Sequence, residues 1–339
     1  MTPALAALAL LAACNDSDPS DDSSPSEPVI GTDVTVTAFE AEPVYFTGKE
    51  NLRQVDKPVP FPDAGQRYSQ VTLNVSLTCP TGGCDFWDRL GRLSIVDDQD
   101  QEIELARFIT PFRVGADFSV DVTDLQRLLE GQRTVRVFID TWVGPDSPYG
   151  DGWLVDASFD FQGGLPASDP FAVVPLWAPH GIVYGDPAQP TAQSTQADVP
   201  EGVTGMRLRA LVTGHGQGNA ENCAEFCSKE HTFTVGAKPI TKPVWRDDCE
   251  TTAAPGQQGT WQYARAGWCP GAMVEPWIED VDATVGALAV GYDIEPYENT
   301  CRPDATSCSG CTLGTGCDYN DSSHTEPNFQ QSALLILLR

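Results

Sequence analysis

Basic residues are scarce in this chain of 339 residues, which has 20 Lys and Arg against 48 Asp and Glu and a formal net charge of −28. Lys and Arg form no cluster anywhere along it. Nucleic-acid binding requires a basic face that neutralises phosphates, so the composition excludes that class of protein. Anionic partners are disfavoured for the same reason, whereas an uncharged sugar is compatible with the sequence.

The sequence also lacks an apolar run long enough to cross a bilayer as a helix. The apolar start, residues 1–14, is shorter than a membrane span and has the small-residue end of a secretory signal. Its last residues, Leu11-Ala-Ala-Cys14, resemble the lipobox of bacterial lipoproteins, in which the cysteine is lipidated. We therefore expect a lipoprotein-type signal peptide over 1–14. The protein is expected to be an exported bacterial lipoprotein, periplasmic or at the cell surface, anchored in a membrane at Cys14.

Apolar residues are absent from the segment Asn15-Asp-Ser-Asp-Pro-Ser-Asp-Asp-Ser-Ser-Pro-Ser-Glu-Pro28. Such a segment cannot bury enough surface to offset the entropy of ordering. We predict a disordered acidic Ser/Pro tether over residues 15–32. The rest of the chain, about 300 residues, suffices for one large or two medium domains.

Eleven cysteines are present, and setting Cys14 aside leaves ten, an even number. In an exported protein this indicates up to five disulfides. Proximity in the sequence predicts Cys79–Cys84, Cys223–Cys227 and Cys249–Cys269. Two more disulfides are expected among four further cysteines, whose connectivity stays open: Cys301, Cys308, Cys311 and Cys317.

Alternation of apolar and polar residues with a period of two indicates β-strands in both halves of the chain. The alternating segments are 71–77, 118–122, 134–142, 153–161, 206–212, 231–235 and 286–291. The closing run 333–338 is continuously apolar, which fits a strand buried on both faces. Only 123–131 predicts a helix, capped by Thr123 and ended by Gly131.

Many short strands between Gly and Pro turns predict an all-β protein built of sandwiches or jelly rolls. The segment 163–170 is rich in turn residues and divides the strands into two groups. We therefore predict an N-terminal domain over 33–166 and a C-terminal domain over 167–339, the latter with a Cys-rich insertion at 301–317.

Two acids stand out by their neighbours. Asp88 lies between Trp87 and Arg89, a combination suited to a sugar, because the ring stacks on a pyranose while the charged groups form hydrogen bonds. A surface ion pair beside a core tryptophan is the alternative. Glu225 lies between Cys223 and Cys227, and a disulfide there would hold it in the fixed geometry that a catalytic acid requires. A solvated acid in a structural loop is the alternative for Glu225.

A metal site is a further possibility at the second acid. Cys223, Cys227 and His231 lie at i, i+4 and i+8, and zinc binds Cys and His. The oxidising compartment favours a disulfide over this site, and His231 opens an alternating segment.

Several motifs resemble the peptide-N-glycosidase F family in one order along the chain. Cys79…Cys84-Asp-Phe-Trp-Asp88-Arg89 is similar to that family's Cys…Cys-Asp-x-Trp-Asp-Arg segment, and Arg107-Phe-Ile-Thr-Pro111 to its Arg-Phe-Ile-Thr-Pro strand. Cys223-Ala-Glu-Phe-Cys227 followed by His231-Thr is similar to its Cys-Ala-Glu-x-Cys…His-Thr segment, and Arg265-Ala-Gly-Trp-Cys-Pro-Gly271 to an identical family motif.

The resemblance implies two antiparallel eight-stranded jelly-roll domains packed side by side. It implies hydrolysis of the amide that joins an asparagine side chain to the first N-acetylglucosamine of an N-glycan, which releases the glycan and leaves aspartate. The partners would be N-linked glycoproteins or glycopeptides, without a cofactor or a metal, and we expect a monomer that meets a membrane only through its lipid anchor.

The resemblance also assigns site residues at the cleft between the two domains. Asp88 matches the principal catalytic acid and Glu225 the second acid, so each domain would present one. Asp140 in Asp140-Thr-Trp142 matches a third acid, a glutamate in the family, and is shorter by one methylene. The positions that match residues lining or bracing the cleft, and so expected to bind substrate, are Trp87, Arg89, Trp142, Arg265 and Trp268. Packing on the Cys269 disulfide is the alternative for Trp268.

Two other features depart from the family pattern. His215 in Thr213-Gly-His-Gly-Gln-Gly218 has no certain counterpart, and the insertion at 301–317 is absent from the prototype. A glycan-binding lipoprotein without catalysis is one alternative function. A copper-dependent monooxygenase is another, because such enzymes share a paired jelly-roll architecture, but the four histidines are scattered along the chain: His180, His215, His231 and His324.

Overall fold

A computed structural model describes residues 28–218, 222–302 and 326–339 of the chain. The predicted signal peptide, most of the predicted tether, and Cys308, Cys311 and Cys317 lie outside these residues. The N-terminal half forms nine strands: β1 (Val29–Ile30), β2 (Val34–Val44), β3 (Gln54–Pro60), β4 (Gln66–Thr78), β5 (Leu90–Val96), β6 (Glu102–Ile109), β7 (Ala116–Asp121), β8 (Gln132–Ile139) and β9 (Trp153–Gly163).

The C-terminal half forms the remaining strands. They are β10 (Pro170–Val183), β11 (Gln193–Val199), β12 (Gly205–His215), β13 (Lys229–Val235), β14 (Lys238–Val244), β15 (Ala272–Met273), β16 (Trp277–Val281), β17 (Gly286–Ile294) and β18 (Asn328–Leu338). Two short helices accompany the strands, the 3₁₀ helix η1 (Thr123–Leu128) and α1 (Cys249–Thr252).

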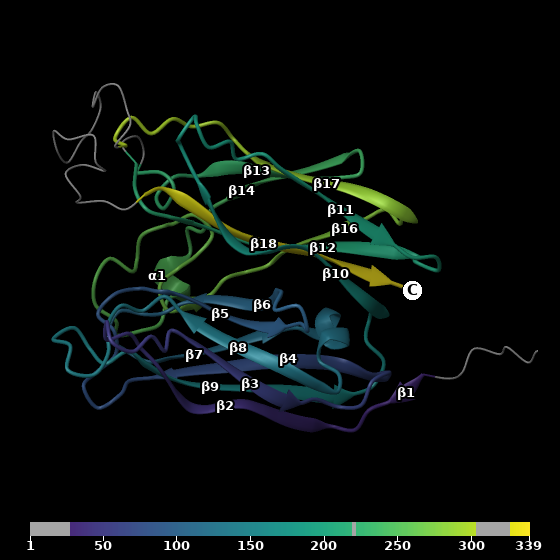
Figure 1. The fold of residues 1–339 in the computed structure, drawn as a ribbon, viewed down its shortest axis with the longest axis horizontal. Helices are drawn as coiled ribbons and strands as arrows, with labels where there is room; N and C mark the ends of the chain where they lie inside the picture. The colour runs from purple at the N-terminus through teal and green to yellow at the C-terminus, as the bar shows by residue number, and fades with distance from the viewer. Residues whose placement is uncertain (1–27, 219–221, 303–325) are drawn as a thin grey trace, which may run out of the picture.

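The strands form four sheets that lie as layers one above another (Figure 1). The N-terminal half has an outer sheet in the order β1-β4-β9-β2, with β7 also paired to β4, and an inner sheet in the order β15-β6-β5-β8-β3. The C-terminal half has an inner sheet β10-β18-β12-β16 and an outer sheet β11-β17-β13-β14. Each half is a jelly roll of eight long strands, and the two pack side by side, which confirms the predicted fold class.

Alternation along the outer-sheet strands explains the packing within each half. In β9 every second residue from Trp153 to Phe161 is buried, and in β4 the buried positions include Val71, Leu73 and Val75. Successive side chains of a strand point to opposite faces, so this pattern places one face in the core and the other toward solvent. The long strands therefore follow directly from the period-two sequence pattern.

Two local predictions are wrong. Val29–Ile30, inside the predicted tether, form β1 and pair in parallel with Gln66 and Arg67, because β4 offers unpaired backbone at that edge. The segment after β7 forms only a short 3₁₀ helix that ends at Leu128, and Thr123 does not cap it. The Thr123 hydroxyl instead accepts from the backbone N–H of Val71 and so joins the helix to β4.

The strand β18 belongs to the cores of both halves. Ala333, Leu335 and Leu337 pack into the C-terminal core, whereas Leu334 and Ile336 pack into the N-terminal core. All five side chains are buried, which confirms the strand buried on both faces that the closing apolar run predicts. The two inner sheets are therefore in direct apolar contact.

A buried polar network crosses the same interface. The Arg107 guanidinium on β6 pairs with Glu104, from Nη2 to Oε2 over 2.6 Å. Its Nη1 donates to the hydroxyl of Thr213 on β12 at 3.0 Å and to the carbonyl of Gln330 on β18 at 2.7 Å. A buried charge is tolerated only when it is paired and hydrogen-bonded, so this network ties the two jelly rolls together in one register.

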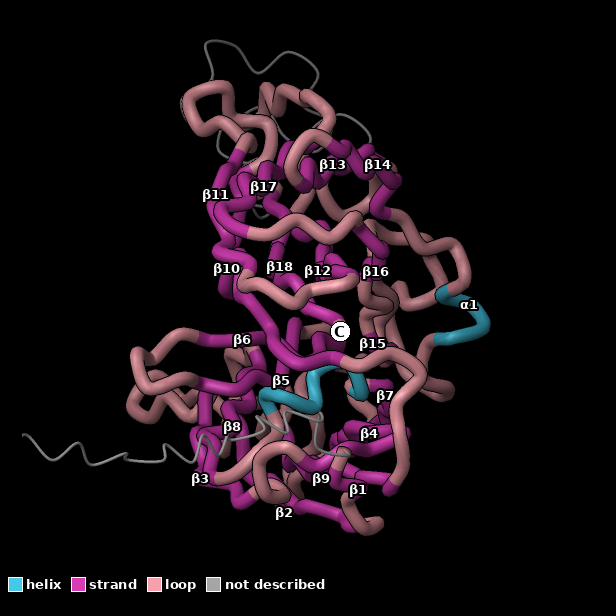
Figure 2. The backbone as a smooth tube through the Cα atoms, turned by 90° about the vertical axis from the view of Figure 1, so that its right-hand side faces the viewer, coloured by secondary structure: helices cyan, strands magenta, loops and turns pink. Residues whose placement is uncertain are grey.

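One strand crosses from one half to the other. Residues Ala272–Met273 of the C-terminal half form β15 and pair with Ile109 and Phe108 at the edge of the N-terminal inner sheet. Figure 2 shows β15 between the two groups of strands. Within the described ranges, no helix has the length and apolar character needed to cross a membrane.

Candidate active site

The first acid-bearing segment connects β4 to β5 and is held by a disulfide and a buried carboxylate. The disulfide Cys79–Cys84 closes its beginning. Asp85 is fully buried and accepts hydrogen bonds from the backbone N–H of Trp87 at 3.0 Å, from Arg89 Nε at 2.8 Å and from the Thr141 hydroxyl at 2.7 Å. These contacts fix the turn on which the next acid lies.

Asp88 is half-buried and lines a cleft between the two halves. Burial raises the pKa of its carboxyl, and the buried carboxylate of Asp85 acts in the same direction. The guanidinium groups of Arg265 and Arg89 oppose this by favouring the ionised form. Since Arg265 belongs to the C-terminal half, the charge state of Asp88 depends on both halves of the molecule.

The second acid-bearing segment lies between β12 and β13. The disulfide Cys223–Cys227 closes a loop of five residues around Glu225. The backbone N–H of Glu225 donates to the carbonyl of Gly216 at 3.0 Å, and its carbonyl accepts from Ala266 at 2.9 Å. The backbone of this loop is therefore held on both sides, and it sets the direction of the Glu225 side chain.

The zinc alternative at this loop is wrong. Cys223 and Cys227 are joined in a disulfide, so neither supplies the thiolate that zinc requires. His231 is buried in the core on β13, where its Nδ1 lies 2.6 Å from the Tyr292 hydroxyl. Histidine and cysteine are therefore structural at these positions.

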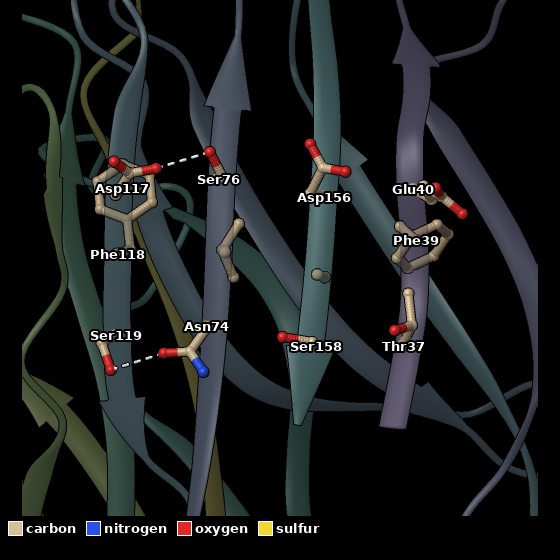
Figure 3. A pocket seen from close by; sticks show the side chains of 12 residues that line it. Thr37, Phe39, Glu40, Asn74, Ser76, Asp117, Phe118, Ser119, Asp156 and Ser158 are labelled. Carbon is tan, nitrogen blue, oxygen red and sulfur yellow. Dashed lines mark hydrogen bonds between the residues drawn. The ribbon is translucent and has the colours of Figure 1, made fainter. Parts of the chain in front are cut away.

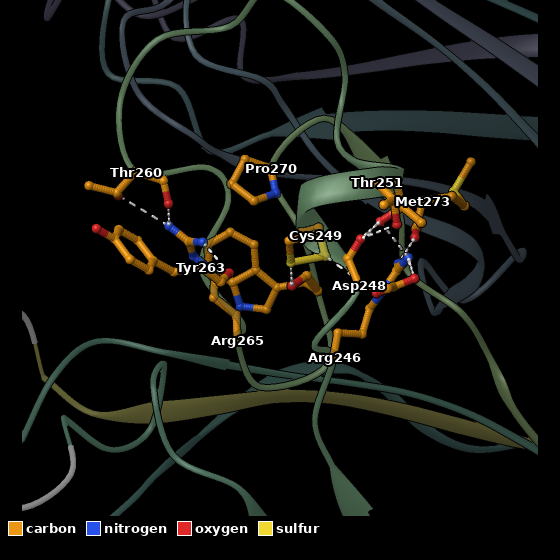
Figure 4. The surroundings of a disulfide bond; sticks show 12 residues. Arg246, Asp248, Cys249, Thr251, Thr260, Tyr263, Arg265, Pro270 and Met273 are labelled. Carbon is orange, nitrogen blue, oxygen red and sulfur yellow. Dashed lines mark hydrogen bonds and ion pairs between the residues drawn. A yellow bond between two sulfur atoms is a disulfide. The ribbon is translucent and has the colours of Figure 1, made fainter.

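Arg265 braces the second acid. Its side chain is 1% exposed, and its Nε donates to Glu225 Oε1 at 3.2 Å. The remaining donors bond the carbonyls of Tyr263 and Thr260 at 2.9 and 2.8 Å (Figure 4). The guanidinium carbon also lies 4.8 Å from the centre of the Trp268 ring. With its donors used in this way, Arg265 holds the Glu225 side chain in place.

The electrostatic state of Glu225 is unusual for a carboxyl group. Burial raises its pKa to about 7, and the nearby charge of Asp88 contributes in the same direction. Arg265 and the Gln217 side chain oppose this rise through hydrogen bonds. Two carboxyl groups that share a confined site do not both ionise readily, so one of the pair keeps a proton near neutral pH.

Asp140, the third predicted acid, lies directly after β8 at the N-terminal side of the cleft. Its side chain is 48% exposed, and its Oδ1 lies 3.3 Å from Nη1 of Arg53. Burial raises the pKa of Asp140, whereas Arg53, Arg89 and a hydrogen bond from the Trp142 side chain oppose the rise. The structure thus brings all three predicted acids to one cleft.

The cleft has a volume of about 530 Å³ and is lined by both jelly rolls. Its lining residues from the N-terminal half are Trp87, Asp88, Arg89, Leu90, Arg92, Ile109, Phe138 and Asp140. Those from the C-terminal half are His215, Gly216, Glu225, Trp268, Asn328 and Gln330. A cleft of this size at a domain interface is typical of a ligand site.

The three predicted tryptophans differ in exposure. Trp87 and Trp142 are 43% and 53% exposed and present ring surface to solvent. Trp268 is only 3% exposed, donates from Nε1 to the Gly214 carbonyl at 2.7 Å and stacks on His215. Trp268 therefore contributes an edge to the cleft but mainly supports its floor.

His215 completes that floor, although the sequence left its place open. The Thr213 hydroxyl accepts from Arg107 and is also hydrogen-bonded to His215, with 2.8 Å between its oxygen and Nε2. Burial lowers the pKa of His215 to about 3, and Arg107 contributes to the shift. The imidazole is therefore neutral at physiological pH.

Two residues of the site were missed from the sequence. Asp85 lies within the quoted motif beside Asp88, and its position directly after Cys84 is the signal that could have marked it as buried. Arg53 comes from the connection between β2 and β3, and nothing in the sequence indicates that it reaches Asp140.

A larger hollow, of about 580 Å³, lies elsewhere, on the outer face of β2, β9, β4 and β7 (Figure 3). Short polar side chains line it, with hydrogen bonds from Ser76 to Asp117 and from Ser119 to Asn74. None of the predicted site residues borders it. Acids from both domains line the interdomain cleft, where Asp88 helps to raise the pKa of Glu225, so this cleft is the stronger candidate for chemistry.

Fold and cleft together define an all-β protein of two jelly rolls that presents acids from both halves at their interface. Family models agree: "Peptide-N-glycosidase F, N terminal" matches residues 93–148 and "Peptide-N-glycosidase F, C terminal" matches 183–306, together just over half of the chain. The chain belongs to the peptide-N-glycosidase F family.

Individual relatives fit this membership. Peptide-N(4)-(N-acetyl-beta-D-glucosaminyl)asparagine amidase F of Elizabethkingia miricola is 26% identical over 251 residues, 69% of each chain. The structure of PNGase F, a glycosylasparaginase from Flavobacterium meningosepticum, superposes with a TM-score of 0.75 at 21% identity, over 91% of this chain and 96% of that one. PNGF-II has a similar fold, with a TM-score of 0.70 at 16% identity over 90% of this chain and 65% of that chain.

Proposed function

We propose that the protein is an N-glycan amidase, which hydrolyses the amide between an asparagine side chain and the first N-acetylglucosamine of glycoproteins or glycopeptides. The single observation that carries this proposal is the cleft to which each jelly roll contributes one acid, Asp88 and Glu225, and in which Asp88 helps to raise the pKa of Glu225. Family membership supports the choice of the amide bond, since the curated relative bears that activity in its name.

The two acids suit the two proton transfers that amide hydrolysis needs. Asp88, with Arg89 and Arg265 favouring its charged form, would accept a proton from a water that attacks the side-chain carbonyl carbon. Glu225, which keeps its proton up to about pH 7, would donate to the departing nitrogen as the carbon–nitrogen bond breaks. The products would be an aspartate and a glycosylamine, so atoms and protons balance without a redox step.

The rest of the cleft would hold the sugar. Exposed rings of Trp87 and Trp142 would stack on apolar pyranose faces, and Arg89 would donate to hydroxyl groups. Asp140 would accept from the sugar or the amide. Arg265 and Trp268 would keep Glu225 in place, since both are buried behind it.

We also propose export and membrane anchoring. Three disulfides form among the described residues, and Cys301 is also disulfide-bonded, which fits an oxidising compartment. Lipidation at Cys14, with residues 15–28 as a spacer, would hold the enzyme at a bacterial membrane while its cleft stays free for glycoproteins.

The deciding experiment is glycan release from a denatured N-glycoprotein by the wild type, Asp88→Asn and Asp117→Asn. The wild type is expected to release glycan and convert asparagine to aspartate, a mass gain of about one unit. Asp88→Asn should lower the rate at least about 100-fold, since it removes the proton acceptor. Asp117→Asn, on the outer sheet face, is the matched control and should retain full activity.

Two results would contradict the proposal in different ways. Full turnover by Asp88→Asn would show that Asp88 is not the proton acceptor of the reaction. Glycopeptide binding by the wild type without any release would indicate a glycan-binding protein on the same scaffold.

A further inference from the structure

Arg53 contacts both Asp140, which lines the cleft, and Trp142, which lies outside its lining two residues further along the chain. It directly precedes β3, and its carbonyl accepts from Ile139, which places it beside the end of β8. The guanidinium reaches Asp140, 3.3 Å away, and is centred 4.3 Å from the Trp142 ring. Arg53 itself does not border the cleft, so any effect on a substrate must pass through these two residues.

The position of Arg53 is fixed from several sides. Its Nε donates to the Asn51 side chain at 2.9 Å, and the guanidinium also lies 4.9 Å from the centre of the Phe46 ring. Phe46 contacts Trp142 edge to face, with 5.3 Å between ring centres, and its backbone N–H donates to the Val143 carbonyl. A guanidinium held between two rings loses little freedom when it also binds a carboxylate.

We propose that Arg53 is a positioning residue of the active site, which holds Asp140 and Trp142 as one unit facing the sugar. The inference rests on the proposed glycan amidase function. Asp140 carries one methylene fewer than the glutamate that the family resemblance places here, so its short side chain depends more on an external partner to fix its direction. Trp142 is half-exposed and lies against the same guanidinium, so losing Arg53 would release both groups together.

Arg53 also keeps Asp140 in its charged form. The groups that face Asp140 are Arg53 from the β2–β3 connection, Arg89 from the segment before β5, and the Trp142 side chain. All three favour the carboxylate, whereas burial disfavours it. Removal of Arg53 would leave only Arg89 as a cationic partner, and Asp140 would take up a proton at higher pH.

The test compares Arg53→Met with Arg53→Lys, and uses Lys57→Met as the matched control. Lys57 lies on β3, the strand that directly follows Arg53. It pairs with Glu42 and approaches the Phe39 ring, but it has no contact with the cleft. Steady-state kinetics of glycan release from a defined glycopeptide are measured between pH 4 and 9. The carboxyl carbons of ¹³C-labelled aspartate are titrated by NMR in each variant.

Arg53→Met is expected to lower kcat/KM about 10- to 100-fold, with the acid limb of the pH profile moved to higher pH. The Asp140 carbon signal should show the same shift. Arg53→Lys should restore the charge and much of the pH profile but not the stacking on Trp142, so its KM stays raised. Lys57→Met should match the wild type in both measurements.

The outcomes separate the two proposals. A wild type without glycan release, combined with a moved Asp140 titration in Arg53→Met, refutes the amidase function but upholds the role of Arg53. An active wild type with unchanged kinetics and unchanged Asp140 titration in Arg53→Met overturns the role of Arg53. If Arg53→Met fails to fold, an Arg53→Lys profile identical to the wild type, KM included, likewise overturns it.

Discussion

A single proton on Glu225 links the stability and the activity of this protein. Its pKa is raised to about 7, so the folded protein releases that proton at a higher pH than the unfolded chain does. The free energy of unfolding should therefore fall as the pH rises from about 4.5 to above 7, because the folded state then carries a confined negative charge beside Asp88.

Glu225→Gln replaces the titrating carboxyl group, so its protonation no longer affects stability or activity. We expect the difference in unfolding free energy between pH 5 and pH 8 to shrink by about 2 kcal/mol relative to the wild type, measured by urea denaturation. Wild-type glycan release should decline above about pH 7, whereas the variant should be slow at every pH. An unchanged pH dependence of stability in Glu225→Gln would show that Glu225 ionises at its ordinary pKa.

At the residue scale the sequence predicts the acids better than it predicts what holds them. Asp88 lies between Trp87 and Arg89, and Glu225 lies between Cys223 and Cys227, so both could be found from their neighbours in the sequence. Asp85 follows Cys84 directly, but nothing in the sequence indicates that it binds Thr141, or that Arg53 binds Asp140, because these partners are distant in the sequence and become neighbours only through strand pairing. Partners of this kind require knowledge of the strand register.

Among the elements, the disulfide loops contribute differently to stability and to activity. Cys223–Cys227 closes five residues, whereas Cys249–Cys269 has a sequence separation of 20. If a disulfide acts by restricting the unfolded chain, loss of the one that closes the short loop lowers the free energy of unfolding by about 2 kcal/mol. Loss of the one that closes the long loop lowers it by about 3 kcal/mol. Of these two loops, only the short one carries a proposed catalytic residue, Glu225.

The two double Cys→Ser variants should therefore rank in opposite order by loss of glycan release and by loss of stability. Cys223→Ser with Cys227→Ser is expected to lower glycan release about 100-fold because Glu225 loses its fixed place, with the smaller loss in denaturation midpoint. Cys249→Ser with Cys269→Ser should lose more stability and less activity. If activity simply follows stability in both variants, the short disulfide has no special part in positioning Glu225.

Five of the strands that the sequence failed to predict show one of two physical properties. β3, β10 and β14 lie at sheet edges and contain prolines, which cannot donate to a neighbouring strand and interrupt the alternating pattern. β5 and β6 belong to the inner sheet, and β6 is buried at nearly every position, so its pattern lacks alternation. Alternation was clearest in strands with one solvent-exposed face, such as β4 and β9.

Across the whole molecule, the buried network of Arg107 fixes how the two jelly rolls meet. Burial acts to raise the pKa of Glu104, but Arg107 outweighs it and holds the pKa below the ordinary value. Replacement of Arg107 by methionine would leave Glu104 charged and without its partner in the interface. Because the acids of the cleft come from opposite halves, the same change would also disturb the site.

We expect Arg107→Met to lower the free energy of unfolding by about 3–5 kcal/mol, measured by urea denaturation at pH 7. The double variant Glu104→Leu with Arg107→Met should recover much of this loss, because it removes the unpaired charge. A single variant as stable as the wild type would mean that apolar contacts of β18 alone hold the interface.

The division into two β-rich halves follows from the sequence, but their mutual dependence does not. The turn-rich segment 163–170 separates the strands of one jelly roll from those of the other, apart from β15. The interface depends on which faces of β6, β12 and β18 meet, and this is set by packing between residues more than 100 positions apart.

The short strand β15 constrains the way in which such a protein can be inherited or engineered. A gene cut at the junction of the two jelly rolls would yield a first product whose β6 has an open edge where Ala272–Met273 normally lie. The unpaired backbone at that edge would pair with another copy of the protein as readily as with β15. The N-terminal jelly roll is therefore not expected to work as an independent module, and we expect the two halves to be inherited as one unit.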